Sequence, residues 1–185
     1  MQNTKINREE LLNKVSSGIK LLSEQDNSKE LFQLKKLAYK IQNKESYYVF
    51  CGHFSAGKSS LLNDLLQVDK LPTSPIPTSA NVVKLKHGSD KLYITLKNGD
   101  MYQLEDQIEV DELKKLAQDS ASIIELEWCQ ESFKIPTGAV LIDTPGIDST
   151  DMDHLEATNS VIHLADSIFY LMDYQHVHSK TNIDF

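Results

Sequence analysis

One stretch of the sequence carries residue types suited to binding phosphate: Gly52, four intervening residues, then Gly57-Lys58-Ser59. It matches the pattern G-x-x-x-x-G-K-[ST]. The two glycines can adopt backbone conformations closed to residues with a Cβ, so the loop can wrap a phosphate with its N–H groups pointing inward. Lys58 would bring a positive charge to the outer phosphates, and Ser59 would offer a hydroxyl to Mg²⁺. A glycine-rich turn that binds nothing is the alternative interpretation.

A second group of chemically informative residues, Asp143-Thr144-Pro145-Gly146, follows a short apolar run at 138–142. An aspartate at the carboxyl end of a central strand can hold Mg²⁺ through a water. A glycine three residues later can bring its backbone N–H to a γ-phosphate and move when that phosphate leaves. The D-x-x-G pattern is weak alone, but it is strong after an apolar strand and downstream of a phosphate loop.

A proline-rich segment at 71–80 holds the third group of candidates. Its three prolines within six residues argue against regular structure. Phosphate-binding proteins place a nucleotide-sensing loop at this point of the chain, and a threonine there can supply Mg²⁺ with a second hydroxyl. Thr73 and Thr78 are both candidates. A rigid proline-rich connector is the alternative.

The elements that must position these residues are predicted from apolar periodicity. A strand over 46–51 precedes the phosphate loop and a helix over 58–67 follows it. Further strands are predicted over 81–87, 91–97, 123–128, 138–142 and 167–172, and further helices over 110–118 and 151–166. Gly88-Ser89-Asp90 predicts that the strands at 81–87 and 91–97 pair as a β-hairpin.

The first part of the chain, residues 7–43, predicts two amphipathic helices joined by a short polar link. Asn7 and Glu10 have the spacing of a capping box at the first helix. Neither apolar stripe can be buried by the hairpin alone, so the hairpin needs a partner in the main domain, in other helices or in a second chain. We therefore expect a helical segment over 1–44 and an α/β domain over 45–185.

Charge is distributed unevenly along the chain, whose net charge is −8. Residues 1–44 carry nine Lys or Arg against five Asp or Glu, whereas residues 45–185 carry ten against twenty-two. The acidic main domain argues against a nucleic-acid partner. The basic segment could face an anionic membrane or the acidic domain, or could be a solvated helix face. Arg8 is the sole arginine, so the main domain holds none that could act as a catalytic finger, a device worth about 10³–10⁵ in rate.

Targeting signals and disulfides are not indicated. The sequence contains no apolar stretch long enough for a transmembrane helix and no apolar region typical of a secretion signal at its start. Cys51 and Cys129 both lie in apolar, strand-like runs, which predicts two buried thiols rather than a disulfide.

The motifs together resemble those of bacterial dynamin-like GTPases. The resemblance rests on Phe54–Asn63, Leu71-Pro72-Thr73, Pro77–Ala80, Asp143–Ser149 and the runs at 163–166 and 170–174, and it covers residues 46 to about 180. It implies an α/β fold of the P-loop NTPase type, with three layers and a mostly parallel sheet that carries an extra β-hairpin. It also implies that the preceding α-helical hairpin belongs to a helical bundle or neck.

The resemblance implies roles for individual residues. Residues implied to bind the nucleotide are Gly52, Ser55, Ala56, Gly57, Lys58, Ser59, Ser60, Asp143 and Gly146. Ser59 and Thr78 would ligate Mg²⁺, with Asp143 behind a water, and Gly146 would sense the γ-phosphate. Ser55 matches a position that helps to place a monovalent cation in dynamins. The catalytic group implied by the resemblance consists of Lys58, Ser55 and Thr78.

Two features depart from the family pattern. Phe54 stands where eukaryotic dynamins have a glutamine that positions the attacking water. The guanine-reading N-K-x-D or T-K-x-D motif, expected one helix and one strand after 167–172, is missing from the sequence. The chain is therefore expected to be an N-terminal fragment that ends inside the GTPase domain.

The expected function is Mg²⁺-dependent GTP hydrolysis by the intact protein, coupled to membrane remodelling or tethering; for this chain alone, activity is left open. A scaffold whose assembly is switched by nucleotide is one alternative. An ATP-dependent P-loop enzyme is another, disfavoured because no Asp-Glu pair ends the run at 138–142. Expected partners are GTP or GDP, a second copy through the GTPase domain, and membrane lipid through parts outside this chain. The expected location is the cytoplasm, or the inner face of the cell membrane.

Overall fold

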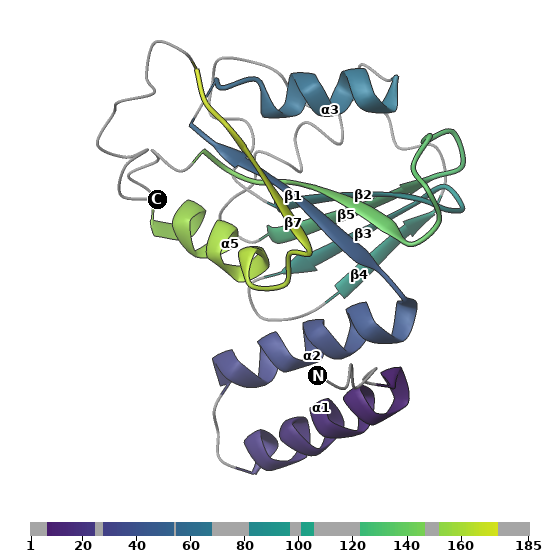
Figure 1. Cartoon of the computed structure of the whole chain (residues 1–185), viewed down its shortest axis with the longest axis vertical. Helices are drawn as coiled ribbons and strands as arrows, with labels where there is room; N and C mark the ends of the chain where they lie inside the picture. The colour runs from purple at the N-terminus through teal and green to yellow at the C-terminus, as the bar shows by residue number, and fades with distance from the viewer. Residues whose placement is uncertain are drawn as a thin grey trace, which may run out of the picture. The chain divides into compact units, whose positions relative to one another are not determined.

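The structure is a computed structural model that describes residues 7–24, 28–53, 55–67, 82–96, 101–105, 123–146 and 152–173 (Figure 1). The chain forms two compact units, Met1–Ser46 and Tyr47–Phe185. Several predictions lie outside the described residues: Phe54, the loop at 71–80 with Thr73 and Thr78, and the helix at 110–118. Within the described part, no helix is both long and apolar enough to cross a membrane.

The first unit is a pair of helices, α1 (Arg8–Ser23) and α2 (Ser28–Asn43). Asn7 is the N-cap of α1, as predicted, because its side chain accepts a hydrogen bond from the Glu9 N–H at 3.3 Å. Glu10 forms an ion pair with Lys14 at 2.7 Å instead of completing the capping box. The two helices approach closely at Gly18, where a Cβ would lie 3.0 Å from the Leu34 Cδ1.

The second unit is built on a seven-stranded sheet with the order β4-β3-β5-β2-β6-β1-β7. Its strands are β1 (Ser46–Gly52), β2 (Val82–His87), β3 (Lys91–Leu96), β4 (Met101–Glu105), β5 (Ile123–Gln130), β6 (Ala139–Asp143) and β7 (Ser167–Leu171). The pairs β1–β7 and β2–β5 are parallel, whereas β2–β6, β3–β4 and β3–β5 are antiparallel. The α/β fold is as expected, but the sheet is mixed rather than mostly parallel, and β6 pairs antiparallel with β2.

The predicted β-hairpin between β2 and β3 is wrong, although both strands form where the sequence places them. β5 lies between them, parallel to β2 and antiparallel to β3. Ion pairs join β2 to β5, from Lys84 to Glu125 at 2.7 Å and from Lys86 to Glu127 at 2.5 Å. These opposite charges favour β5 as the neighbour of β2. On its other side β3 pairs antiparallel with β4, the strand that follows it in the chain.

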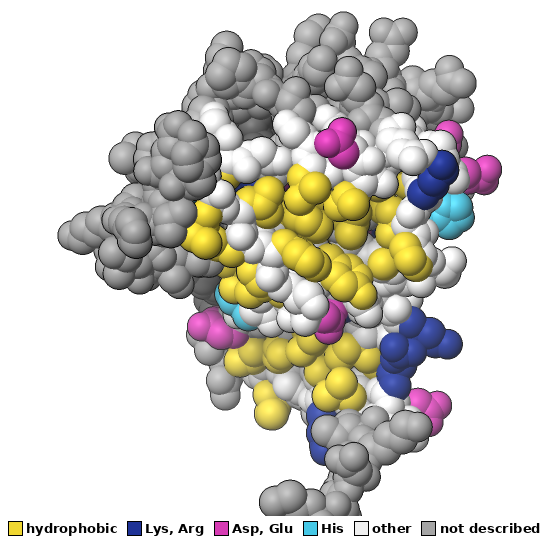
Figure 2. Space-filling model, turned by 45° about the horizontal axis from the view of Figure 1, so that its top comes forward, with side chains coloured by type: hydrophobic (Ala, Val, Ile, Leu, Met, Phe, Trp, Pro, Cys, Tyr) yellow, Lys and Arg dark blue, Asp and Glu magenta, His cyan; other side chains and the backbone are white. Residues whose placement is uncertain are grey.

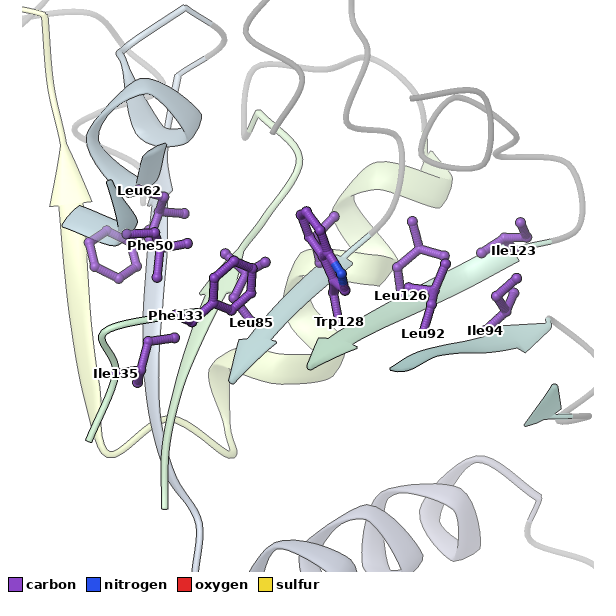
Figure 3. Close-up of a cluster of buried hydrophobic side chains, with 12 residues drawn as sticks. Phe50, Leu62, Leu85, Leu92, Ile94, Ile123, Leu126, Trp128, Phe133 and Ile135 are labelled. Carbon is purple, nitrogen blue, oxygen red and sulfur yellow. The ribbon is translucent and has the colours of Figure 1, made fainter. Parts of the chain in front are cut away.

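The main core lies on one face of this sheet, beneath α3 (Lys58–Leu66). Figure 3 shows its side chains in a row across the strands, with Leu62 of α3 beside Phe50 and with Leu85, Trp128 and Leu126 farther along. The helix α5 (Met152–Ile162) lies on the other side of the sheet (Figures 1 and 3). It ends at Ile162, four residues before the predicted boundary at 166. The chain then turns, and the Leu164 N–H donates a hydrogen bond to the Val161 carbonyl oxygen.

The apolar run at 167–172 predicts a buried strand, but β7 is largely exposed, so this prediction is wrong. It lies at the edge of the described sheet beside β1, and its Ile168 and Phe169 are 48% and 46% exposed. Phe169 stacks on Phe50 with 4.9 Å between ring centroids. Leu61 and Leu65 of α3 are also exposed, and Figure 2 shows hydrophobic side chains gathered on the face that it presents.

Candidate functional site

The phosphate loop connects the end of β1 to the start of α3, as the sequence predicts. Gly52 has a φ of 145°, and a Cβ there would lie 2.1 Å from the Leu171 carbonyl oxygen of β7. Gly57 has a φ of 89°, and a Cβ there would meet nothing within 4 Å. The two glycines therefore serve different purposes, since Gly52 permits a close backbone contact and Gly57 permits a left-handed turn into the helix.

Lys58 is buried at the first position of α3 and reaches back across the loop. Its Nζ donates hydrogen bonds to the carbonyl oxygens of Gly52, at 3.1 Å, and His53, at 2.8 Å. Two of the ammonium protons are thereby directed at the loop backbone. The positive charge of Lys58 and the N-terminus of α3 both favour an anion bound by the loop.

Ser55 lies at the exposed tip of the loop with a φ of 62°, in the left-handed region that residues with a side chain rarely adopt. The next residue, Ala56, donates its N–H to the His53 carbonyl at 3.2 Å. Successive residues in left-handed and turn conformations turn their N–H groups toward one concave side. The left-handed conformations of Ser55 and Gly57 are of the kind found in backbone turns that bind anions, so the loop remains a candidate anion site.

The second motif meets the first at the end of β6. The Ser59 hydroxyl donates a 2.6 Å hydrogen bond to the Asp143 Oδ2, joining residues 84 positions apart. Gly146 follows as a half-buried residue with no regular structure. The structure thus brings together Lys58, Ser59 and Asp143, while Thr78 and Phe54 lie outside the described residues.

Asp143 is a buried carboxylate with unused hydrogen-bonding capacity. Its Oδ1 is buried and has no hydrogen-bond partner among the residues that the structure describes. Burial raises the pKa of the Asp143 carboxyl, while the Ser59 hydroxyl, the Lys58 charge and the Thr144 backbone N–H act in the opposite direction. A buried, partly unsatisfied charge is costly for the folded state.

These residues fit a magnesium ion. A hard cation of this kind takes oxygen ligands and keeps several waters. The free Asp143 Oδ1 could accept from such a water, and the Ser59 oxygen beside it could ligate the ion directly. The described residues hold no group of three or more His, Cys, Asp or Glu, so an all-protein cage is absent from this part and phosphate oxygens would complete the set.

Removing the Asp143 charge is expected to stabilise the nucleotide-free protein. Because the carboxyl pKa is raised in the folded state, the folded state holds its proton more tightly than the unfolded state, and stability falls as the pH rises through that range. Asp143→Asn removes this penalty and can still accept from Ser59. Thermal unfolding without nucleotide should show a higher Tm for the variant, with a gap that widens above the ordinary aspartate pKa of about 3.9. A gap that stays constant with pH would contradict this.

One contact of the site was not anticipated from the sequence. The buried Thr144 hydroxyl donates to the Phe50 carbonyl of β1 at 3.0 Å. The signal available in the sequence was a hydroxyl residue directly after Asp143, where an apolar residue would continue the pattern of the strand. The prediction of two buried thiols is confirmed, because Cys51 and Cys129 are both buried and neither forms a disulfide. Burial raises the pKa of Cys51 to about 11, while the Lys58 charge acts in the opposite direction.

Comparison with known proteins assigns the family. The family model described as the dynamin family matches residues 49–185, which include the whole phosphate loop and Asp143–Gly146. The chain belongs to the dynamin family. The resemblance seen in the motifs is thereby confirmed.

Known dynamin-family members are similar over most of this chain. Dynamin-like protein A of Bacillus subtilis (strain 168) is 40% identical over 179 residues, which cover 97% of this chain and 15% of that protein. Dynamin-like protein 1 of Campylobacter jejuni (strain 81-176) is 26% identical over 94% of this chain and 29% of its own length. The chain thus spans less than a third of these two relatives.

The fold agrees with that of solved bacterial dynamins. A structure described as an oligomerised bacterial dynamin pair, with a mechanism for the long-range sensing and tethering of membranes, matches all of this chain and 37% of its own with a TM-score of 0.60. A second structure of the same description matches with a TM-score of 0.54. At 22% and 20% identity these matches establish the dynamin-type fold of the P-loop NTPase class, with helices ahead of it.

Proposed function

We propose that the intact protein binds GTP and hydrolyses its γ-phosphate with Mg²⁺, and that hydrolysis is coupled to membrane remodelling or tethering. The observation that supports this most directly is the Ser59–Asp143 hydrogen bond beside the buried Lys58 ammonium. This bond joins the start of α3, directly after the loop, to the end of β6, which supports a shared site for phosphate and metal. Family membership supplies guanine nucleotide as the substrate class.

In this proposal the residues of the two motifs, together with Thr78, bind and orient the nucleotide and the metal. The backbone of residues 55–60 holds the phosphates, and Lys58 neutralises charge on the outer ones as water attacks in line. Ser59 and Thr78 would ligate Mg²⁺, Asp143 would act on it through a water, and Gly146 would contact the γ-phosphate. Bound Mg²⁺ supplies neutralisation of the phosphate charge.

Turnover by the isolated protein is proposed to be slow. Residues 45–185 contain no arginine, so the charge that develops on the γ-phosphate must be met from elsewhere. A monovalent cation placed with the help of Ser55 is one source, and a second copy docked across the nucleotide face is the other. Either source makes turnover depend on solution conditions.

The test uses the full-length protein. GTP should displace a fluorescent guanine nucleotide at concentrations where ATP does not, and GTP turnover per molecule should rise with protein concentration or on exchange of Na⁺ for K⁺. Equal competition by ATP would favour the ATP-dependent alternative. Turnover indifferent to both protein concentration and K⁺ would overturn the proposed source of acceleration.

A scaffold switched by nucleotide is the second candidate. The helices α1 and α2 favour it, because Leu11 and Leu21 are exposed and Val15 is the one buried apolar side chain among their described residues. Partners in this case are a second copy and membrane lipid at the inner face of the cell membrane. Co-sedimentation of the full-length protein with anionic liposomes that changes with GTP, without measurable hydrolysis, would select this function over the first.

A further inference from the structure

Thr144 occupies an unusual place between the two motifs. Its side chain is fully buried, and its Oγ1 donates to the Phe50 carbonyl oxygen at 3.0 Å. The Pro145 carbonyl lies 3.3 Å from the same oxygen, but one hydroxyl has a single proton and the Phe50 contact is the shorter. Phe50 lies two residues before Gly52, where β1 gives way to the phosphate loop.

The bond extends the contact between two neighbouring strands. β6 lies next to β1 in the sheet and ends at Asp143. One residue beyond that end, the Thr144 side chain donates a hydrogen bond to a β1 carbonyl. The chain around Asp143 is consequently held at two points, by Thr144 on β1 and by the Asp143 carboxylate on Ser59 of α3.

The same bond lies in the buried part of the motif, and the less buried Gly146 follows it. Thr144 and Pro145 are buried, and proline restricts the backbone further through its fixed φ. Gly146 is the first residue of the motif that is only half-buried, and it has no restricting side chain. The backbone at Gly146 is therefore less restricted than the backbone at Thr144 and Pro145.

We propose that Thr144 is a positioning residue whose hydroxyl fixes the Asp143 carboxylate relative to the phosphate loop, so that the magnesium site is arranged before nucleotide binds. This inference rests on the proposed function for the metal and the nucleotide, but the fixing of the segment is a property of the chain itself. Thr144 acts through Asp143 and touches neither phosphate nor metal.

Two substitutions separate the hydroxyl from the packing of the side chain. Thr144→Val keeps the branched shape and removes the donor, which leaves the Phe50 carbonyl without this partner. Thr144→Ser keeps the donor and removes a methyl group. A role in packing alone predicts that serine is the more harmful change, whereas the positioning role predicts that valine is.

The experiment measures how much Mg²⁺ the full-length protein needs to bind a fluorescent, non-hydrolysable GTP analogue, well below the Tm of every variant. Thr144→Val should raise the Mg²⁺ concentration at half-saturation about fivefold, the effect of one neutral hydrogen bond. Thr144→Ser should stay close to the wild type. In the nucleotide-free proteins, amide hydrogen exchange around 143–146 should be faster for valine than for serine.

The outcomes divide clearly. A valine variant with a lower Tm but an unchanged Mg²⁺ requirement and unchanged exchange would show a purely structural role and overturn the inference, as would a serine variant that is the worse of the two. A wild-type protein that binds no guanine nucleotide would overturn the proposed function and the metal part of this inference. Hydrogen exchange would still decide whether the hydroxyl fixes the segment.

Discussion

Replacing Lys58 with alanine is expected to lower the affinity for GTP about a thousandfold. One charge pair at roughly 4 Å and an effective dielectric of about 20 is worth about 4 kcal/mol, and each 1.4 kcal/mol is tenfold in affinity. The Lys58 ammonium is buried and donates hydrogen bonds to the Gly52 and His53 carbonyl oxygens, so its charge is weakly screened by solvent. Titration of the full-length protein with a fluorescent GTP analogue measures the loss.

Two control variants make this result specific. Lys58→Arg keeps the charge, but a guanidinium is larger than an ammonium and planar. It should not fit between the Gly52 and His53 carbonyl oxygens that now accept from the Lys58 Nζ, so the affinity for GTP should also fall. Lys134→Ala removes an exposed lysine whose partner is Gln67, and affinity should not change. Equal affinity of Lys58→Ala and the wild type would contradict the assignment of the phosphate loop.

Gly52→Ala is expected to destabilise the protein by about 2–6 kcal/mol, because steric overlap in a packed interior costs about 1–3 kcal/mol and a non-glycine residue at positive φ about 1–3 kcal/mol more. The new Cβ would lie 2.1 Å from the Leu171 carbonyl oxygen, and that backbone belongs to the ladder between β1 and β7. Relief of the overlap requires the two strands to separate. Urea unfolding monitored by circular dichroism measures the loss.

Gly57→Ala is the matched comparison, since it makes the same chemical change in the same loop. Its φ of 89° brings backbone strain, but its Cβ would enter open space. We expect a loss of about 1–2 kcal/mol from strain alone. If Gly52→Ala destabilises the protein no more than Gly57→Ala does, the close contact with β7 does not exist in solution.

The sequence was sufficient for features that depend on neighbouring residues. The strand before Gly52, the helix that begins at Lys58 and the N-cap at Asn7 all form where predicted. Each is determined within a few residues by glycine conformation, apolar periodicity or a side-chain cap. Local signals of this kind predict the folded structure correctly because the conformation of each segment depends mainly on its own residues.

Pairing between strands was predicted less well, since it depends on segments far apart. Gly88-Ser89-Asp90 indicates a turn between β2 and β3, but it cannot reveal that β5 inserts between them. The available clue was a match of alternating charges, which is visible only when the two strands are compared. Lys84 and Lys86 of β2 pair with Glu125 and Glu127 of β5. Likewise, the apolar character of β7 does not tell an edge strand from a central one.

The candidate site shows the same division. Residue types indicated that Lys58, Ser59 and Asp143 belong together, but the direct Ser59–Asp143 bond and the reach of Thr144 to Phe50 are contacts across 84 and 94 positions. No spacing rule predicts them. The roles of Thr78 and Ser55 stay predictions that mutagenesis must test.

The burial of both thiols has a practical consequence for fluorescence experiments. Dyes that modify cysteine react with the thiolate of an accessible side chain. Cys51, with its pKa of about 11, and the buried Cys129 should react slowly at neutral pH. A cysteine introduced at an exposed position such as Ser89 would therefore take up dye selectively within this chain. Pairs of such dyes could report the distance between two copies without any change to the native cysteines.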